Sequence, residues 1–337
     1  MWTKFGSILW TQFWSTGLNL GTTFCESMLA HFLSQVHGFW SWADWLKQQA
    51  ADIGREPVFI NLDETSVSKA MPGARGMVVG KPWWPGEVRP QQRVPKKDLR
   101  SMITHVGLCT HRTDLQGKLP QIFIGNHYCF TPDLMARASQ VAPGKVKFWR
   151  RTSSWNNSRL MSDILLEIAL VLTEFPGLQP ILVFDCASIH LPSSVLRTAN
   201  ALGIWILPVP ARCTFLLQPC DTHVFSPYKA YLQNKYRESK NEDGDVTPEA
   251  WARTLIDAAT KFMCSRRWSA AFEQTGIIGD RMHLTRELAT LTVPVVSSPA
   301  PFPLLRVVRD LLPRNRRVPY SQLVSEPLGR QLRVVLF

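Results

Sequence analysis

The 337-residue sequence lacks the features of a secreted or membrane-spanning protein. Its seven cysteines are odd in number and irregularly spaced, which does not indicate a disulfide framework and is typical of a reducing compartment. Nowhere do about 20 uninterrupted apolar residues occur, so we expect no membrane span. The aromatic N-terminal stretch is interrupted by polar residues and has no small-residue cleavage site, so we expect no signal peptide.

Acidic residues are scarce beside basic ones. The 26 Asp and Glu residues face 38 Lys and Arg residues, which gives a formal net charge of +12. This excess favours a polyanionic partner through counterion release and electrostatic steering. Nucleic acid is the first candidate, although acidic membranes and ribosomes also attract basic proteins, so the motifs must decide.

Zinc ligands in a usable pattern are also missing. Cys213, Cys220 and His223 lie close together in sequence, but no matching pair of cysteines two residues apart accompanies them. We therefore expect no structural zinc site there.

The first half of the chain predicts a partly helical segment followed by three strands. Residues 1–57 form the N-terminal segment, and the apolar run PVFINLDETS predicts a buried strand that ends at Asp63. After a Gly-, Pro- and Lys/Arg-rich loop, SMITHVGLCT and LPQIFIG predict two more strands joined by the turn-like TDLQGK. An antiparallel meander is the economical arrangement.

The second half alternates strands and helices. Helices are predicted at 157–174, 193–202 and about 221–239, with the strands PILVFD, which ends at Asp185, and GIWILPV between them. Such alternation favours parallel pairing. The predicted division is a core over 58–240, a helical addition over 241–282 and a poorly ordered Pro- and Arg-rich tail over 283–337.

Three aspartates stand where a two-metal site would need them. Asp63 and Asp185 end strands that would bring them to one sheet edge, and Asp221 opens a later helix. Each alone is more commonly a turn or cap residue. Together they offer the oxygen ligands that two divalent cations need to activate water and stabilise a leaving oxygen.

The segments around these aspartates resemble the acidic motifs of the mariner/pogo superfamily of DDE transposases. FINLDETS resembles the first motif, ILVFDCASIH the second, and LPVPARCTFLLQPCDTHVFSPYKAYLQNKY the third, with 35 residues between Asp185 and Asp221. The resemblance covers about residues 58–280 and is strongest to the Tigger/centromere-protein-B-derived branch. The chain departs from it with Cys186 after the second acid and with Thr222 and His223 after the third.

The resemblance implies an α/β fold, a ribonuclease-H-like mixed sheet flanked by helices, with helical N- and C-terminal additions. It implies that Asp63, Asp185 and Asp221 bind Mg²⁺ or Mn²⁺, and that the protein cleaves and joins DNA phosphodiesters with these ions. The same resemblance implies DNA as the partner, a homodimer within a DNA complex and a nuclear location. No membrane partner is expected. The usual tandem helix-turn-helix module does not fit within the 57 residues before the core.

Residues beside the triad have alternative interpretations. His190 matches the histidine of the second motif. We expect it either to contact a phosphate or the attacking water, or to be a structural histidine at a helix start. For Glu64, an exposed loop position is favoured over a role in supporting the metal ligands. Lys229 contacts the DNA backbone or faces solvent.

Two segments interleave basic and aromatic residues. They are RPQQRVPKKDLR, with Lys96 and Lys97, and KVKFWRRTSSWNNSR, with Arg150 and Arg151 between tryptophans. Such segments suit phosphate contacts and stacking on distorted or flanking bases, and a solvated basic face is the alternative.

Two rival functions remain at this stage. A domesticated or decayed DNA-binding protein would keep the fold without catalysis, and the intact triad argues against it. A metal-dependent phosphatase is disfavoured because Thr65 stands where its second aspartate would be.

Overall fold

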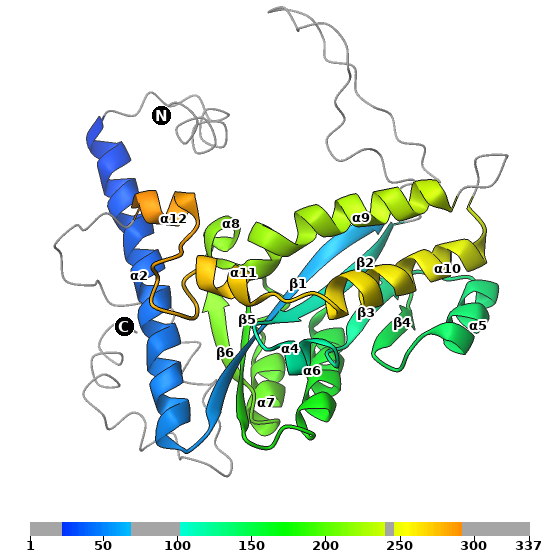
Figure 1. Cartoon of the computed structure of the whole chain (residues 1–337), viewed down its shortest axis with the longest axis horizontal. Helices are drawn as coiled ribbons and strands as arrows, with labels where there is room; N and C mark the ends of the chain where they lie inside the picture. Colours follow the sequence, from blue (N-terminus) through cyan, green and yellow to red (C-terminus); the bar gives the residue numbers. More distant parts are fainter. Residues whose placement is uncertain (1–21, 69–101, 240–245, 292–337) are drawn as a thin grey trace, which may run out of the picture.

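A computed structural model describes residues 22–68, 102–239 and 246–291 of the chain (Figure 1). Its centre is a six-stranded sheet in the order β4-β3-β2-β1-β5-β6. The strands are β1 (Glu56–Ser68), β2 (Met102–Thr110), β3 (Gln121–Gly125), β4 (Val146–Arg150), β5 (Leu178–Asp185) and β6 (Trp205–Val209).

The strand directions are those of a ribonuclease-H-like sheet. β1, β2 and β3 form an antiparallel meander, and β5 and β6 run parallel to β1 on its other side. β4 extends the sheet parallel to β3. The predicted fold class, a mixed α/β sheet with three antiparallel strands followed by two parallel ones, is confirmed.

Helices cover both faces of the sheet (Figure 1). α6 (Ser158–Leu172) and α7 (Ser193–Ala201) lie on one side, and α9 (Phe225–Glu238) and α10 (Pro248–Asp257) on the other. The remaining elements are α2 (Thr22–Asp52), α4 (Thr113–Gln116), α5 (Pro132–Val141), α8 (Thr214–Leu217), η2 (Cys220–Val224), η3 (Ala258–Cys264), α11 (Ser269–Gln274) and α12 (Arg286–Leu291). None of the helices in the described ranges is long and apolar enough to cross a membrane.

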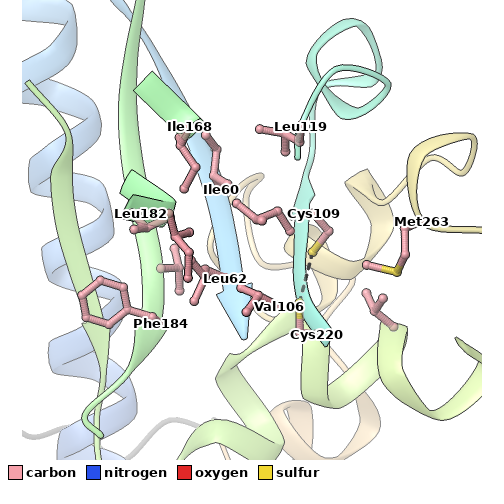
Figure 2. Close-up of a cluster of buried hydrophobic side chains, with 14 of the residues drawn as sticks. Ile60, Leu62, Val106, Cys109, Leu119, Ile168, Leu182, Phe184, Cys220 and Met263 are labelled. Atoms are coloured by element: carbon pink, nitrogen blue, oxygen red, sulfur yellow. Dashed lines mark hydrogen bonds between the residues drawn. The ribbon is translucent and has the colours of Figure 1, made fainter. Parts of the chain in front are cut away.

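The core fills both faces of the central strands. Figure 2 shows Ile60 and Leu182 of neighbouring strands near Ile168 of α6, while on the other face Cys109 of β2 lies next to Cys220 of η2 and Met263 comes from η3. Fully burying an aliphatic side chain stabilises the fold by about 1.5–3 kcal/mol. The central strands β1 and β5 are covered on both faces, which explains why they contain continuous apolar runs.

A glycine permits close packing opposite Asp63. Gly107 of β2 pairs with Asp63, and a Cβ at Gly107 would lie 3.0 Å from the Phe225 ring and 3.3 Å from Met263. α9 and η3 therefore approach the sheet closely beside Asp63.

The structure also corrects several predictions. β4 and α5 were not predicted, and KVKFWR, interpreted only as a basic-aromatic segment, contributes an edge strand. Five residues give too short a pattern to distinguish a strand from a loop. The turn-like TDLQGK contains the short α4. α12 lies at the start of the predicted Pro- and Arg-rich tail, most of which is outside the described residues.

Candidate functional site

Asp63 and Asp185 occupy matching positions on neighbouring parallel strands. The last paired residues of β1 and β5 are Asn61 and Val183, and each aspartate lies two residues further along its strand. Adjacent strands are about 4.8 Å apart, so the register brings the two backbones together where β5 ends.

The prediction that Asp63 ends its strand is wrong. β1 continues to Ser68 because its pairing with β2 persists after its pairing with β5 has stopped. Asp63 nevertheless lies just beyond the end of the β1–β5 pairing, whose last paired residue on β1 is Asn61.

Asn61 ties the third acidic segment to this edge. Its buried side chain donates from Nδ2 to the Val183 carbonyl at 2.9 Å and accepts at Oδ1 from the Cys220 N–H at 2.7 Å. Cys220 begins η2, so one amide connects β1, β5 and the turn that carries Asp221. Asn61 was missed in the sequence, where its only signal is a polar residue inside the apolar run FINLD.

The turn that carries Asp221 is a π-helical turn rather than the start of a regular α-helix. Such turns are rare and occur frequently at functional sites. The Gln218 carbonyl accepts hydrogen bonds from the N–H and the hydroxyl of Thr222, which stabilises the backbone on both sides of Asp221.

The Asp63 and Asp221 carboxyl groups meet in a hydrogen bond. Burial raises the pKa of Asp63 well above its ordinary value, and the negative charges of Asp221 and Glu64 raise it further. Asp221 is exposed, yet partial desolvation still raises its pKa, against the opposing hydrogen bonds from Thr214 and Asp63. Asp63, the more deeply buried of the two acids, is therefore the one whose protonated form is favoured more strongly.

His190 lies at the other end of the cluster, fully buried. Its Nδ1 is 2.6 Å from Asp185 Oδ1, and its Nε2 is 3.0 Å from Glu64 Oε1. Burial alone would lower the pKa of His190, but these two acceptors raise it to about 10, so the ring is an imidazolium at neutral pH. The same contact outweighs burial at Asp185, whose pKa is lowered.

The structure overturns the interpretation of Glu64 as an exposed loop residue. Glu64 lies within β1 with its side chain 19% exposed, and its Oε1 also accepts from Asn156 Nδ2 at 2.5 Å. The sequence predicts a loop there because the residues after Asp63 are polar, and nothing in that pattern indicates that pairing with β2 continues to Ser68. Buried His190 presents no exposed edge to a phosphate, which favours the structural alternative for this residue.

The donor set suits a hard divalent cation. Carboxylate oxygens from three segments approach one edge, where burial first and then the charges of Asp221 and Glu64 raise the pKa of Asp63. Among the described residues, no group of three or more His, Cys, Asp or Glu side chains is gathered closely enough to hold a metal ion as it stands. The three aspartates form an open arrangement in which Asp63 and Asp221 pair and Asp185 is held by His190.

The predicted DNA-contacting residues differ in their surroundings. Arg150 ends β4 and donates from Nε to the Phe130 carbonyl at 2.7 Å, so its guanidinium is partly engaged. Arg151 is exposed beside the Trp149 ring, 5.8 Å from its centroid. Lys229 is half-buried, and its charge lowers the pKa of Asp221. Lys96 and Lys97 lie outside the described residues.

Comparison with known proteins gives similarity to solved structures alone. No protein-family model matches the sequence, and neither does any curated protein. Similar structures include a Mos1 transposase paired-end complex with the left transposon end (14% identity, TM-score 0.36), the Mos1 mariner paired-end complex with Mn (14%, 0.34) and the Mos1 strand transfer complex (13%, 0.35). Each match covers 72% of this chain and 62% of the Mos1 chain, so this chain spans less than two thirds of that protein.

Proposed function

We propose that this chain is the catalytic domain of a DDE-type transposase or endonuclease, mariner/pogo-like and nearest the Tigger/centromere-protein-B-derived branch, which cleaves and joins DNA phosphodiesters. The observation that carries the proposal is the register that sets Asp63 beside Asp185, with Asp221 hydrogen-bonded to Asp63. The net charge of +12 supports DNA as the substrate. A nuclear location and a homodimer on DNA are part of the same proposal.

Asp63, Asp185 and Asp221 would hold two Mg²⁺ or Mn²⁺ ions. Such ions supply an activated nucleophile, first water and then a freed 3′-hydroxyl, and stabilise charge on the phosphate. The chain's own contribution is positioning: the sheet fixes Asp63 and Asp185, and Asn61 fixes the turn bearing Asp221. No side chain serves as the nucleophile in this scheme.

Cation binding would also remove the cost of gathering these acids. Asp63 must lose its shared proton before both of its oxygens can bind metal, and the positive charge of a divalent ion favours that loss. Cation affinity should therefore rise with pH through the range in which Asp63 deprotonates.

The test is nicking of supercoiled plasmid in Mg²⁺ and in Mn²⁺. Wild-type protein should nick the plasmid, and Asp63→Ala, Asp185→Ala and Asp221→Ala should each abolish nicking because each loses an anionic ligand. Asp185→Asn should be nearly as damaging, since a neutral amide cannot balance the ions' charge. DNA retention by all the variants should stay near the wild-type level or increase, because repulsion of phosphate is reduced.

Two results would decide against this function. Nicking that survives all four substitutions would show that the aspartates are not the active site. Retention of DNA by a wild-type protein that never nicks would favour the alternative, a domesticated or decayed DNA-binding protein.

A further inference from the structure

We propose that His190 and Glu64 are positioning residues that orient the Asp185 carboxylate for metal binding, and that Asn156 holds Glu64 in place. The inference rests on the proposed function, because it concerns a proposed metal ligand. We call the chain of contacts Asp185–His190–Glu64–Asn156 the carboxylate clamp.

At the Asp185 end, the clamp selects one carboxylate oxygen. Oδ1 accepts from the Ala187 N–H at 3.0 Å and lies 2.6 Å from His190 Nδ1. The described residues give Oδ2 no hydrogen bond, so Oδ2 is the oxygen that the clamp leaves for a cation. Two donors on one oxygen also fix the plane of the carboxylate, which a single donor would leave free to rotate.

At the Glu64 end, the clamp crosses from β5 to β1. His190 is held by its own backbone, whose N–H donates to the Ala187 carbonyl at 3.0 Å, and its Nε2 meets Glu64 Oε1 at 3.0 Å. Glu64 follows Asp63 directly, so the clamp links one proposed ligand, Asp185, to the residue next to another, Asp63.

Asn156 closes the chain of contacts from a third segment. Its side chain is 9% exposed and donates to the same Glu64 oxygen at 2.5 Å, and it precedes Asn157, which caps the N-terminus of α6. Glu64 Oε1 thus has donors from two directions. A partly buried carboxylate with such fixed partners has few alternative rotamers, which is what a positioning residue requires.

The contacts differ in kind from those of a metal ligand. If Glu64 acts by accepting hydrogen bonds, glutamine can replace it, because the amide carbonyl accepts at the same position. If Glu64 binds the cation with its charge, glutamine should fail as badly as alanine. The pair Glu64→Gln and Glu64→Ala therefore separates positioning from direct ligation.

The experiment measures Mn²⁺ affinity in the full chain from the loss of the free-ion electron paramagnetic resonance signal. Partners that orient a ligand typically contribute 10- to 100-fold to metal affinity, so His190→Ala and Glu64→Ala should weaken Mn²⁺ binding by about tenfold or more. Glu64→Gln should stay within about threefold of wild type, a range below that expected for a lost orienting partner.

The matched control is Gln179→Ala. Gln179 is buried near the opposite end of β5, where its Nε2 donates to the Gly203 carbonyl at 2.9 Å. Its loss should lower the thermal midpoint without changing Mn²⁺ affinity. If His190→Ala does not fold, the two Glu64 variants still decide the question.

The outcomes are separable. No Mn²⁺ binding by wild type would overturn the proposed metal site itself. Wild-type binding that His190→Ala and Glu64→Ala leave unchanged would overturn the clamp alone. Loss of affinity in Glu64→Gln as large as in Glu64→Ala would overturn positioning in favour of direct ligation.

Discussion

At the scale of single residues, the crowding of Asp63 with other acids predicts a pH-dependent weakness in the metal-free protein. The pKa of Asp63 is raised in the folded state, so the folded state binds more protons than the unfolded state above the unfolded value near 4. Stability should therefore fall as pH rises through that window. Asp63→Asn cannot ionise and keeps an N–H donor for Asp221, so it should unfold at a higher temperature than wild type near neutral pH in EDTA.

Thermal unfolding across a pH series measures this difference. About 1 kcal/mol of relief would raise the midpoint by roughly 2–4 °C for a domain of this size, and the gain should vanish below about pH 4. Added Mn²⁺ should stabilise wild type more than Asp63→Asn. Asp163→Asn, on α6 outside the cluster, is the control. Parallel stability curves for wild type and Asp63→Asn would show that the crowding has no energetic consequence.

The candidate site residues that the sequence could single out are those marked by their immediate neighbours. Asp63 and Asp185 follow apolar runs, and Asp221 follows a Pro-containing loop. Asn61 and Asn156 could not be recognised, because their partners lie 159 and 92 residues away along the chain. A polar residue within an apolar run gives no indication of which distant backbone group it will satisfy.

At the scale of elements, the loop between β4 and α6 is rigidly anchored yet presents an unusually exposed tryptophan. Ser154 Oγ accepts from the Asn126 N–H at 3.0 Å, and Asn156 is bonded to Glu64. Trp155, between these anchors, is 80% exposed, and Arg151 is exposed on the same loop. An exposed aromatic face on a loop that also carries an exposed cation suits stacking on an unpaired base.

Binding of a fluorescent oligo(dT) strand tests this element. Stacking of one base contributes about 1–3 kcal/mol, so Trp155→Ala should weaken binding by roughly fivefold to a hundredfold, whereas Trp155→Phe should retain most of the affinity. Leu170→Ala removes another exposed apolar side chain, 65% exposed on α6, and should have no effect. Equal losses in Trp155→Ala and Leu170→Ala would argue against base stacking.

Elements were predictable where a pattern was long and failed where pairing partners decided the outcome. α6 and α7 lie almost where their apolar periodicity placed them. β1 extends beyond its apolar run only because β2 pairs with it as far as Ser68. β4 forms because β3 offers a free edge, and no property of VKFWR alone distinguishes that strand from a basic loop.

At the scale of the whole molecule, the excess of basic over acidic residues predicts DNA binding that depends steeply on salt and little on sequence. For duplex DNA, the logarithm of the association constant should fall with the logarithm of salt concentration by about 0.9 for each phosphate contacted. If the predicted basic segments make these contacts, the slope should become shallower in a variant with alanine at Lys96, Lys97, Arg150 and Arg151.

The control must remove the same charge from elsewhere. Four basic residues already form ion pairs with neighbouring carboxylates, and replacing them by alanine lowers the net charge equally; they are Arg137, Lys235, Arg253 and Lys261. Affinity across a salt series should show a shallower slope for the first variant and a nearly unchanged slope for the control, with thermal midpoints measured because Arg150 also bonds to the Phe130 carbonyl. Equal slopes for both variants would mean that net charge attracts DNA without the predicted segments touching it, and a flat wild-type slope would contradict phosphate binding altogether.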